Sequence, residues 1–333
     1  MRDLFTSFKD NCGFGLLASI DNTPSHKNLE DAITSLSRMM HRGAIAADGK
    51  TGDGSGLLLS LPKSFFNKEA AADSVALPET YAVAMVFSNN ETDFDVINRV
   101  CENNDLKVLY TRTVPVDTNA LGEQALASLP MMKQVFVAPE SAVASNRFEA
   151  LVYLSRKEIE AELIEDPTFY IPSFSTSVIS YKGLVMPTHI KEFYKDLDNK
   201  DFEISFCLFH QRFSTNTLPE WKLAQPFRMI AHNGEINSVT ANRFNVKTKM
   251  ANAKSTVFTD EEMDRLRNVI QDGMSDSASL DNFMEFLRVN GVDFFKAARS
   301  LVPAPWHNNP QMDTELRAFY EYSSATFEAW DGP

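Results

Sequence analysis

The sequence has few cysteines: only Cys12, Cys101 and Cys207 occur among its 333 residues. Their number is odd and they lie far apart, which excludes a disulfide framework and a closely spaced zinc site. So low a cysteine content favours a reducing compartment, and we therefore expect a cytoplasmic protein.

Long apolar runs and an excess of basic residues are also absent. The longest apolar stretches, such as residues 81–87, fall far short of the roughly 18 residues that a membrane-spanning helix needs. The N-terminal segment lacks signal-peptide character, because Lys9, Asp10 and Asn11 interrupt it. The chain has 32 Lys and Arg against 45 Asp and Glu, a formal charge of −13. Because an acidic surface without a Lys/Arg cluster repels phosphate groups, we expect neither nucleic acid nor a membrane as a partner.

The remaining composition is that of a folded protein with a sizeable core, since 44% of the residues are hydrophobic and 25 are Phe. Apolar runs and period-two alternation predict strands at residues 12–20, 57–61, 81–87, 107–116, 175–183 and 202–213. Helical spacing predicts a helix capped by Asn28 and further helices at 93–104, 260–273 and 280–291, the last two each closed by glycine. Residues 148–163 are expected to begin as a strand and turn helical. Many strands with few intervening helices indicate an α+β fold of packed sheets covered by helices.

The glycine-rich segment 43–56 contains Gly49-Lys50-Thr51, like the end of a phosphate-binding P-loop. The P-loop pattern needs glycine where Ala44 stands, and a P-loop follows a strand and opens a helix, whereas this segment follows a helix and opens a strand. Nucleotide binding is therefore disfavoured. Two interpretations stay open: a tight connection whose glycines supply positive φ, and a loop beside a substrate site.

No metal site is expected. Cys207 and His210 are three residues apart on an alternating strand, so their side chains should point to opposite faces of the sheet and cannot share an ion.

Four further signals are weak when each is taken alone. Asn233-Gly234 predicts a type I′ hairpin turn, with a strand before and after it in residues 229–237. Asp276 suits the cap of the helix that follows it. Arg212, just after an apolar strand, needs a carboxylate partner.

The fourth signal is Cys12, which by itself is interpreted as a small buried residue. These signals lie in four segments: DNCGFGLLASI (10–20), MMHRGAIAADGKTGDGSGLLLSLP (39–62), FHQRFSTNTLPEWKLAQPFRMIAHNGEIN (209–237) and SDSASLDN (275–282). Together they closely resemble the N-terminal glutamine amidotransferase domain of the glutamate synthase large (alpha) subunit, a class II, N-terminal-nucleophile amidotransferase. The resemblance follows the motif order over essentially the whole chain. It implies a four-layer αββα sandwich of the N-terminal-nucleophile hydrolase type, with a propeptide at 1–11 and the amidotransferase domain at 12–333, truncated at its C-terminal end.

The resemblance implies catalytic roles for three residues. Cys12 becomes the mature N-terminus and the nucleophile, after cleavage behind Asn11. Asn233 and Gly234 form the oxyanion hole.

It also implies three substrate-binding residues. Arg212 holds the α-carboxylate of glutamine, Asp276 meets its α-ammonium group, and Thr215 lines the same pocket.

The function implied is hydrolysis of L-glutamine to glutamate and ammonia, which the full-length enzyme adds to 2-oxoglutarate. No cofactor is expected in this chain, whereas the full-length family enzyme uses FMN and an iron–sulfur cluster. Its other large-subunit domains and a small reductase subunit are the expected partners. Two alternatives stay open: the amidotransferase domain of another class II synthase, and a regulatory module with the same fold that never matures.

Overall fold

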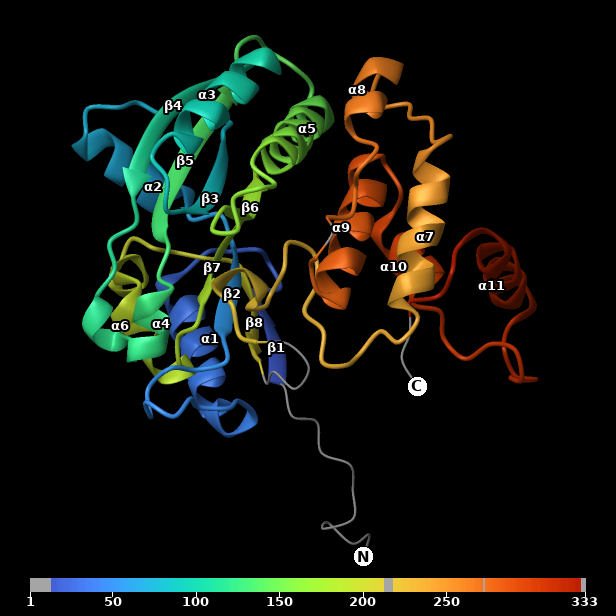
Figure 1. The fold of residues 1–333 in the computed structure, drawn as a ribbon, viewed down its shortest axis with the longest axis horizontal. Coiled ribbons are helices and arrows are strands. Elements are labelled where there is room, and N and C mark those ends of the chain that lie inside the picture. Colours follow the sequence, from blue (N-terminus) through green and yellow to red (C-terminus); the bar gives the residue numbers. More distant parts are fainter. Residues whose placement is uncertain (1–12, 213–217, 272, 331–333) are drawn as a thin grey trace, which may run out of the picture.

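The computed structural model describes residues 13–212, 218–271 and 273–330. Two antiparallel β-sheets with helices packed on them form one part of the molecule, and the helices of the last third of the chain lie beside that part (Figure 1). The α+β class predicted from the sequence is confirmed.

The first sheet has the strand order β1-β8-β2-β7, and each neighbouring pair is antiparallel. Its strands are β1 (Gly13–Ala18), β2 (Ser55–Ser60), β7 (Val178–Gly183) and β8 (Phe206–Gln211). Because side chains alternate along a strand, Cys207 and Phe209 lie on the face that belongs to the largest hydrophobic cluster. His210 lies on the opposite face, so the predicted separation of Cys207 from His210 is confirmed.

The second sheet has the order β4-β5-β3-β6, also antiparallel throughout. Its strands are β3 (Ala82–Ser88), β4 (Leu106–Thr113), β5 (Met131–Pro139) and β6 (Tyr170–Ser175). The Gln134 side chain of β5 donates a hydrogen bond to the Tyr181 hydroxyl of β7 at 2.8 Å, which links the two sheets through buried groups. Each of the six predicted strand segments overlaps a strand, whereas β5 and most of β6 were not predicted.

Helices of the first two thirds of the chain cover the sheets. They are α1 (His26–Arg38), α2 (Lys63–Ala72), α3 (Asp93–Asn103), α4 (Glu123–Ala127), α5 (Ser145–Glu162) and α6 (Ile190–Phe193). Helix α1 packs on β8 and β1, while α3 and α5 pack beside β4 and β6 and share a separate hydrophobic cluster with the second sheet.

Two helix predictions in this region are wrong in detail. The N-cap of α1 is Ser25, whose hydroxyl accepts from the Asn28 backbone N–H at 3.2 Å, while the Asn28 amide donates to the Ile204 carbonyl at 3.0 Å. Residues 148–163 do not begin as a strand, because α5 is helical from Ser145 and buries apolar side chains on several sides.

The last third of the chain contains α7 (Val239–Met250), α8 (Asp260–Arg265), α9 (Asp276–Val289), α10 (Phe294–Leu301) and α11 (Thr314–Thr326). These helices have their own hydrophobic cluster, and α8 and α9 contact α5. The helix predicted at 260–273 is wrong beyond Arg265, where α8 ends. Gly291, with a φ of 83°, follows the end of α9 as predicted.

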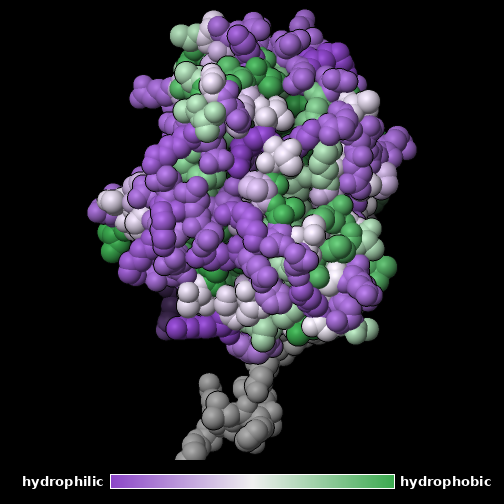
Figure 2. All heavy atoms as spheres, turned by 90° about the vertical axis from the view of Figure 1, so that its left-hand side faces the viewer, coloured by the Kyte–Doolittle hydropathy of each residue, from purple (hydrophilic) through white to green (hydrophobic). Residues whose placement is uncertain are grey.

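The exposed surface of the molecule is not uniformly polar. Polar side chains cover most of the side on which α2 and α6 lie (Figure 2). By contrast, β1 exposes Phe14 and Leu16, which are 53% and 67% accessible to solvent. No helix in the described ranges is long and apolar enough to cross a membrane.

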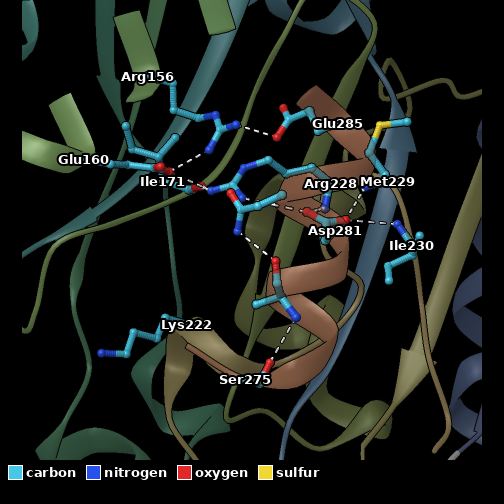
Figure 3. A network of polar contacts seen from close by, with 12 residues as sticks. Arg156, Glu160, Ile171, Lys222, Arg228, Met229, Ile230, Ser275, Asp281 and Glu285 are labelled. Carbon is cyan, nitrogen blue, oxygen red and sulfur yellow. Dashed lines mark hydrogen bonds and ion pairs between the residues drawn. The ribbon is translucent and has the colours of Figure 1, made fainter. Parts of the chain in front are cut away.

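Buried charges connect α5, α9 and the chain between them (Figure 3). The Glu160 carboxylate accepts from Arg156 at 2.7 Å, Lys157 at 3.1 Å and Arg228 at 2.9 Å. Arg156 also pairs with Glu285 of α9. Burial raises the pKa of Glu160, but the three neighbouring cations lower it to about 2. The charged carboxylate therefore stabilises the contact between α5 and the chain that leads to α9.

We expect Glu160→Gln to lower the free energy of unfolding by about 3–5 kcal/mol, because it leaves buried cations without their counter-charge. Glu162→Gln is the matched control on the same helix, since the Glu162–Arg99 pair is about half exposed. That control should change stability by less than about 1 kcal/mol. Urea unfolding at neutral pH measures both.

The same pair of proteins gives a pH test. The native pKa of Glu160 lies below its ordinary value of 4.5, so its contribution is present at neutral pH and is lost as the pH falls from 4.5 toward about 2. The stability difference between wild type and Glu160→Gln should shrink over that interval. Equal losses in the Glu160 and Glu162 variants would contradict the importance of the buried cluster.

Candidate active site

The end of β8 carries three consecutive polar residues, His210, Gln211 and Arg212, all of them buried. Gln211 pairs with Gly13, the first residue of β1. Just beyond the strand, the Arg212 backbone N–H donates to the Gly54 carbonyl at 2.9 Å. Arg212 is therefore fixed at one end of the first sheet, where β1 begins.

The loop that precedes β2 is organised by the carboxylate of Asp48. It accepts the Thr51 hydroxyl at 2.6 Å and the backbone N–H groups of Thr51, Lys50 and Gln124 at 2.7, 3.0 and 3.1 Å. These hydrogen bonds hold the pKa of Asp48 well below its ordinary value, and the one from the Thr51 hydroxyl has the largest effect.

Both interpretations of this loop find support. Gly49 and Gly54 have φ values of 70° and 132°, as expected of glycines that supply positive φ. Because the Gly54 carbonyl binds Arg212, the loop also lies beside a candidate site residue. The loop follows a helical segment and leads into β2, whereas a P-loop follows a strand and leads into a helix.

Residues 225–236 form a loop without strands, and neither Asn233 nor Gly234 has a positive φ. A type I′ turn requires positive φ at both central residues, so the hairpin predicted at 229–237 is wrong. The physical reason is that side chains from other elements, instead of a partner strand, bind the polar backbone groups of this loop.

Asp281, fully buried on α9, holds the first part of the loop. Its carboxylate accepts the backbone N–H groups of Arg228, Met229 and Ile230 at 3.2, 2.7 and 3.1 Å (Figure 3). Burial raises the pKa of Asp281 to about 6, which still leaves the carboxylate ionised at neutral pH. Three consecutive backbone donors thus share one buried anion.

Gln225 holds the middle of the loop by a two-point contact. Its side-chain Oε1 accepts from the His232 N–H at 2.8 Å, and its Nε2 donates to the His232 carbonyl at 3.0 Å. Gly56 of β2 allows this arrangement, because a Cβ atom there would lie 2.6 Å from the Gln225 carbonyl oxygen. The His232 ring is held in turn by the Ser277 hydroxyl, 3.1 Å from Nδ1.

His210 reaches the next residue of the loop from β8. Its Nε2 lies 2.8 Å from Asn233 Oδ1 and 3.2 Å from the His232 carbonyl oxygen. Burial lowers the pKa of His210 to about 4, so its imidazole is neutral at neutral pH. A neutral ring on a central strand therefore contacts the side chain of Asn233.

Asp276 holds the end of the loop. Its carboxylate accepts from the Ile236 N–H at 2.8 Å and from the Ser277 N–H at 2.6 Å. The prediction that Asp276 caps α9 is wrong by one residue, because Ser275 is the N-cap and accepts from the Ala278 N–H. Asp276 is instead the first residue of the helix and remains half-buried, beside the loop.

The structure thus brings together four of the predicted site residues: Arg212 at the end of β8, Asn233 and Gly234 in the loop, and Asp276 at the start of α9. Cys12 and Thr215 lie outside the described residues.

Sequence reasoning missed the residues that hold the site together, namely Gln225, His210 and Asp281. Each is a polar residue that directly follows an apolar one, namely Ala224, Phe209 or Leu280, and a polar residue at the end of a buried apolar stretch needs a partner, which is the signal that could have identified them. In the described part of the chain, no three His, Cys, Asp or Glu side chains are grouped so as to hold a metal ion.

Comparison with known proteins gives a consistent match. The family described as class-II glutamine amidotransferases matches residues 12–333. The chain is 38% identical to the glutamate synthase (NADPH) large chain of Bacillus subtilis, over 97% of this chain and 22% of that protein. It is 37% identical to glutamate synthase (NADH) of Saccharomyces cerevisiae, over 97% and 16%, and 36% identical to ferredoxin-dependent glutamate synthase 1 of Arabidopsis thaliana, over 97% and 21%. The chain spans about a fifth of the length of these relatives.

We expect Asp281→Asn to destabilise the protein by about 2–4 kcal/mol, because the new amide presents a donor to the backbone N–H groups that the carboxylate accepts. Hydrogen exchange of the Met229 and Ile230 amides should become faster. The control is Asp293→Asn at the exposed N-cap of α10, where Asn serves as well as Asp. Unchanged exchange at Met229 and Ile230 would show that Asp281 does not hold the loop.

Proposed function

The chain belongs to the class-II glutamine amidotransferases, and we propose that it hydrolyses L-glutamine with Cys12 as an N-terminal nucleophile. The observation that carries the proposal is the loop of residues 225–236, in which Asn233 contacts His210, two residues before Arg212, and Ile236 contacts Asp276. Because Arg212 follows Gln211, which pairs with the first residue of the strand after Cys12, this arrangement supports a site shared by these residues.

We propose that residues 1–11 form a propeptide and that cleavage behind Asn11 frees the α-amine of Cys12. The family match begins at residue 12, which supports this boundary. A free α-amine has an ordinary pKa of about 7.7–8.0 and a thiol one of about 8.5, so the amine can take the thiol proton near neutral pH. No histidine is then needed as the base.

The proposed chemistry proceeds in two steps. The Cys12 thiolate attacks the side-chain amide carbon of glutamine, the C–N bond breaks, and ammonia leaves with the proton that the α-amine had taken. Water then hydrolyses the γ-glutamyl thioester, which gives glutamate and regenerates the thiol. During each step the Asn233 side-chain N–H and the Gly234 backbone N–H stabilise the oxyanion, each by about 3 kcal/mol.

The ends of the substrate require groups of opposite charge. We propose that the Arg212 guanidinium binds the α-carboxylate in a bidentate manner and that Asp276 binds the α-ammonium group, with Thr215 lining the pocket. The Asp276 carboxylate is suited to this role because two backbone N–H groups already orient it, at 2.6 and 2.8 Å.

We propose that the two sheets belong to the four-layer αββα sandwich of N-terminal-nucleophile hydrolases. The helices packed on each sheet support this arrangement.

We further propose that the chain is the amidotransferase domain of a cytoplasmic glutamate synthase, which adds the ammonia to 2-oxoglutarate. The relatives named above support this function over that of another class II synthase or of a regulatory module that never matures. FMN, the iron–sulfur cluster and contacts with a small reductase subunit would belong to other parts of such an enzyme. Consistently, Cys101 and Cys207 are buried in separate hydrophobic clusters, so the two side chains cannot act together as ligands of one iron–sulfur cluster.

We expect the mature protein to begin at Cys12, as measured by intact mass and N-terminal sequencing. A glutamine-like diazo-ketone should then label Cys12 alone, because burial raises the pKa of Cys101 to about 12 and that of Cys207 further. Free glutamine should slow the labelling. An active protein that retains residues 1–11 would disprove the N-terminal-nucleophile mechanism, and labelling of all three cysteines would disprove the glutamine pocket.

We expect Arg212→Lys to raise KM for glutamine, since a point charge cannot reproduce a planar bidentate contact. Asn233→Ala should instead lower kcat by about 10²–10³, through loss of one oxyanion donor. Arg99→Lys, at an exposed position of α3, is the control for the first change. A folded Arg212→Lys protein with unaltered KM would contradict the carboxylate role, and an unaltered kcat in Asn233→Ala would contradict the oxyanion role.

A further inference from the structure

The contacts of His210 determine which of its ring nitrogens carries the proton. Nε2 lies 3.2 Å from the His232 carbonyl oxygen, an atom that can only accept a hydrogen bond. Nε2 must therefore carry the hydrogen. Its Nδ1, which is buried, meets no hydrogen-bond partner within the described ranges of the chain, which agrees with a neutral ring protonated at Nε2.

This protonation state determines the orientation of the Asn233 amide. Asn233 lies 2.8 Å from the same Nε2–H, so only its carbonyl oxygen, Oδ1, can face the ring. The opposite orientation would place the Asn233 NH₂ group against an N–H donor. The Nδ2 donors of Asn233 consequently point away from His210.

The position of the ring is fixed independently of the loop. His210 is completely buried on β8, the strand that lies between β1 and β2 in the first sheet. The loop is held at the same place by Gln225, which binds both backbone polar groups of His232. Both partners of the His210–Asn233 hydrogen bond are thus in place before a substrate arrives.

We infer that His210 is a positioning residue that orients the Asn233 amide, so that its Nδ2–H group is presented to the developing oxyanion. The inference rests on the oxyanion role proposed above for Asn233. His210 itself exchanges no proton in the reaction. Preorganised donors stabilise a transition state most effectively because they need not reorient as charge develops.

Two amide substitutions test the inference with matched chemistry. The side-chain nitrogen of Gln can take the place of Nε2, whereas that of the shorter Asn corresponds to Nδ1 and cannot reach Asn233. In the mature, full-length protein we expect His210→Asn to lower kcat by about 10²-fold, with KM for glutamine changed less than about threefold. His210→Gln should retain activity within about tenfold of wild type. Comparable thermal melts of the two variants establish that both fold.

A double-mutant cycle separates this inference from the proposed function. In an Asn233→Ala background, His210→Asn should cause no further loss of kcat, because the group that it orients is gone. If Asn233→Ala alone leaves kcat unchanged, the proposed oxyanion role fails. If Asn233→Ala lowers kcat but His210→Asn does not, or if the two losses simply multiply, that role stands and the inference about His210 is wrong.

A measurement on the unmutated protein covers the case in which the variants do not fold. With ¹⁵N-labelled histidine, the ring nitrogen signals of His210 should report a proton on Nε2 and none on Nδ1 between pH 6 and pH 8. A ring protonated at Nδ1 alone would overturn the inference.

Discussion

The candidate site depends on one buried carboxylate, that of Asp281, which accepts backbone N–H groups as a neighbouring strand would in a sheet. Asp281 accepts three consecutive backbone N–H groups at the start of the loop, groups that would otherwise be buried without partners. A carboxylate has enough lone pairs for this task, and its charge makes each hydrogen bond stronger than one between neutral groups. The loop can therefore leave regular secondary structure without losing its backbone hydrogen bonds.

The electrostatic cost of that anion is offset across the contact between the two parts of the molecule. Arg228 lies 3.8 Å from Asp281 and 2.9 Å from Glu160, and Glu160 in turn binds Arg156. Arg156 reaches Glu285 on the same helix as Asp281. Helix α5, which covers the second sheet, is thereby joined to α9, which carries Asp276. The geometry of the site therefore depends in part on α5, a helix that carries none of the proposed site residues.

The sequence predicted the elements whose signals are local. The six strand segments predicted from alternating or apolar runs each overlap a strand, although β5 was missed, and the opposite orientation of Cys207 and His210 followed from strand periodicity alone. The hairpin at Asn233-Gly234 was mispredicted because its turn preference is overridden by acceptors distant in sequence, above all Asp281. The roles that the resemblance implies for Arg212, Asn233, Gly234 and Asp276 stay predictions, while the structure shows the loop around Asn233 in contact with β8 and with Asp276.

The residues that position them could not be predicted in the same way. Gln225 and His210 act through single hydrogen bonds whose partners are known only once the chain has folded. Similarly, Ser25 and Asn28 are both acceptable helix caps by residue type. Only the tertiary contact of Asn28 with the Ile204 carbonyl decides between them.

The hydrogen bonds from the loop backbone to the Asp276 and Asp281 side chains also determine when the candidate site can form during protein synthesis. Residues 225–236 have no hydrogen-bonded ladder of their own, and the acceptors at Asp276 and Asp281 lie 40 residues after Ile236 and 51 residues after Ile230, respectively. A ribosome adds roughly 5–20 residues per second, so the loop leaves it seconds before these acceptors are available. During that interval β8 and its neighbouring strands can already pair, while the loop still lacks its anchors. The sheets of the nascent chain can therefore pair before this loop is anchored, and the loop can reach its final geometry only after α9 has been synthesised and has packed against α5.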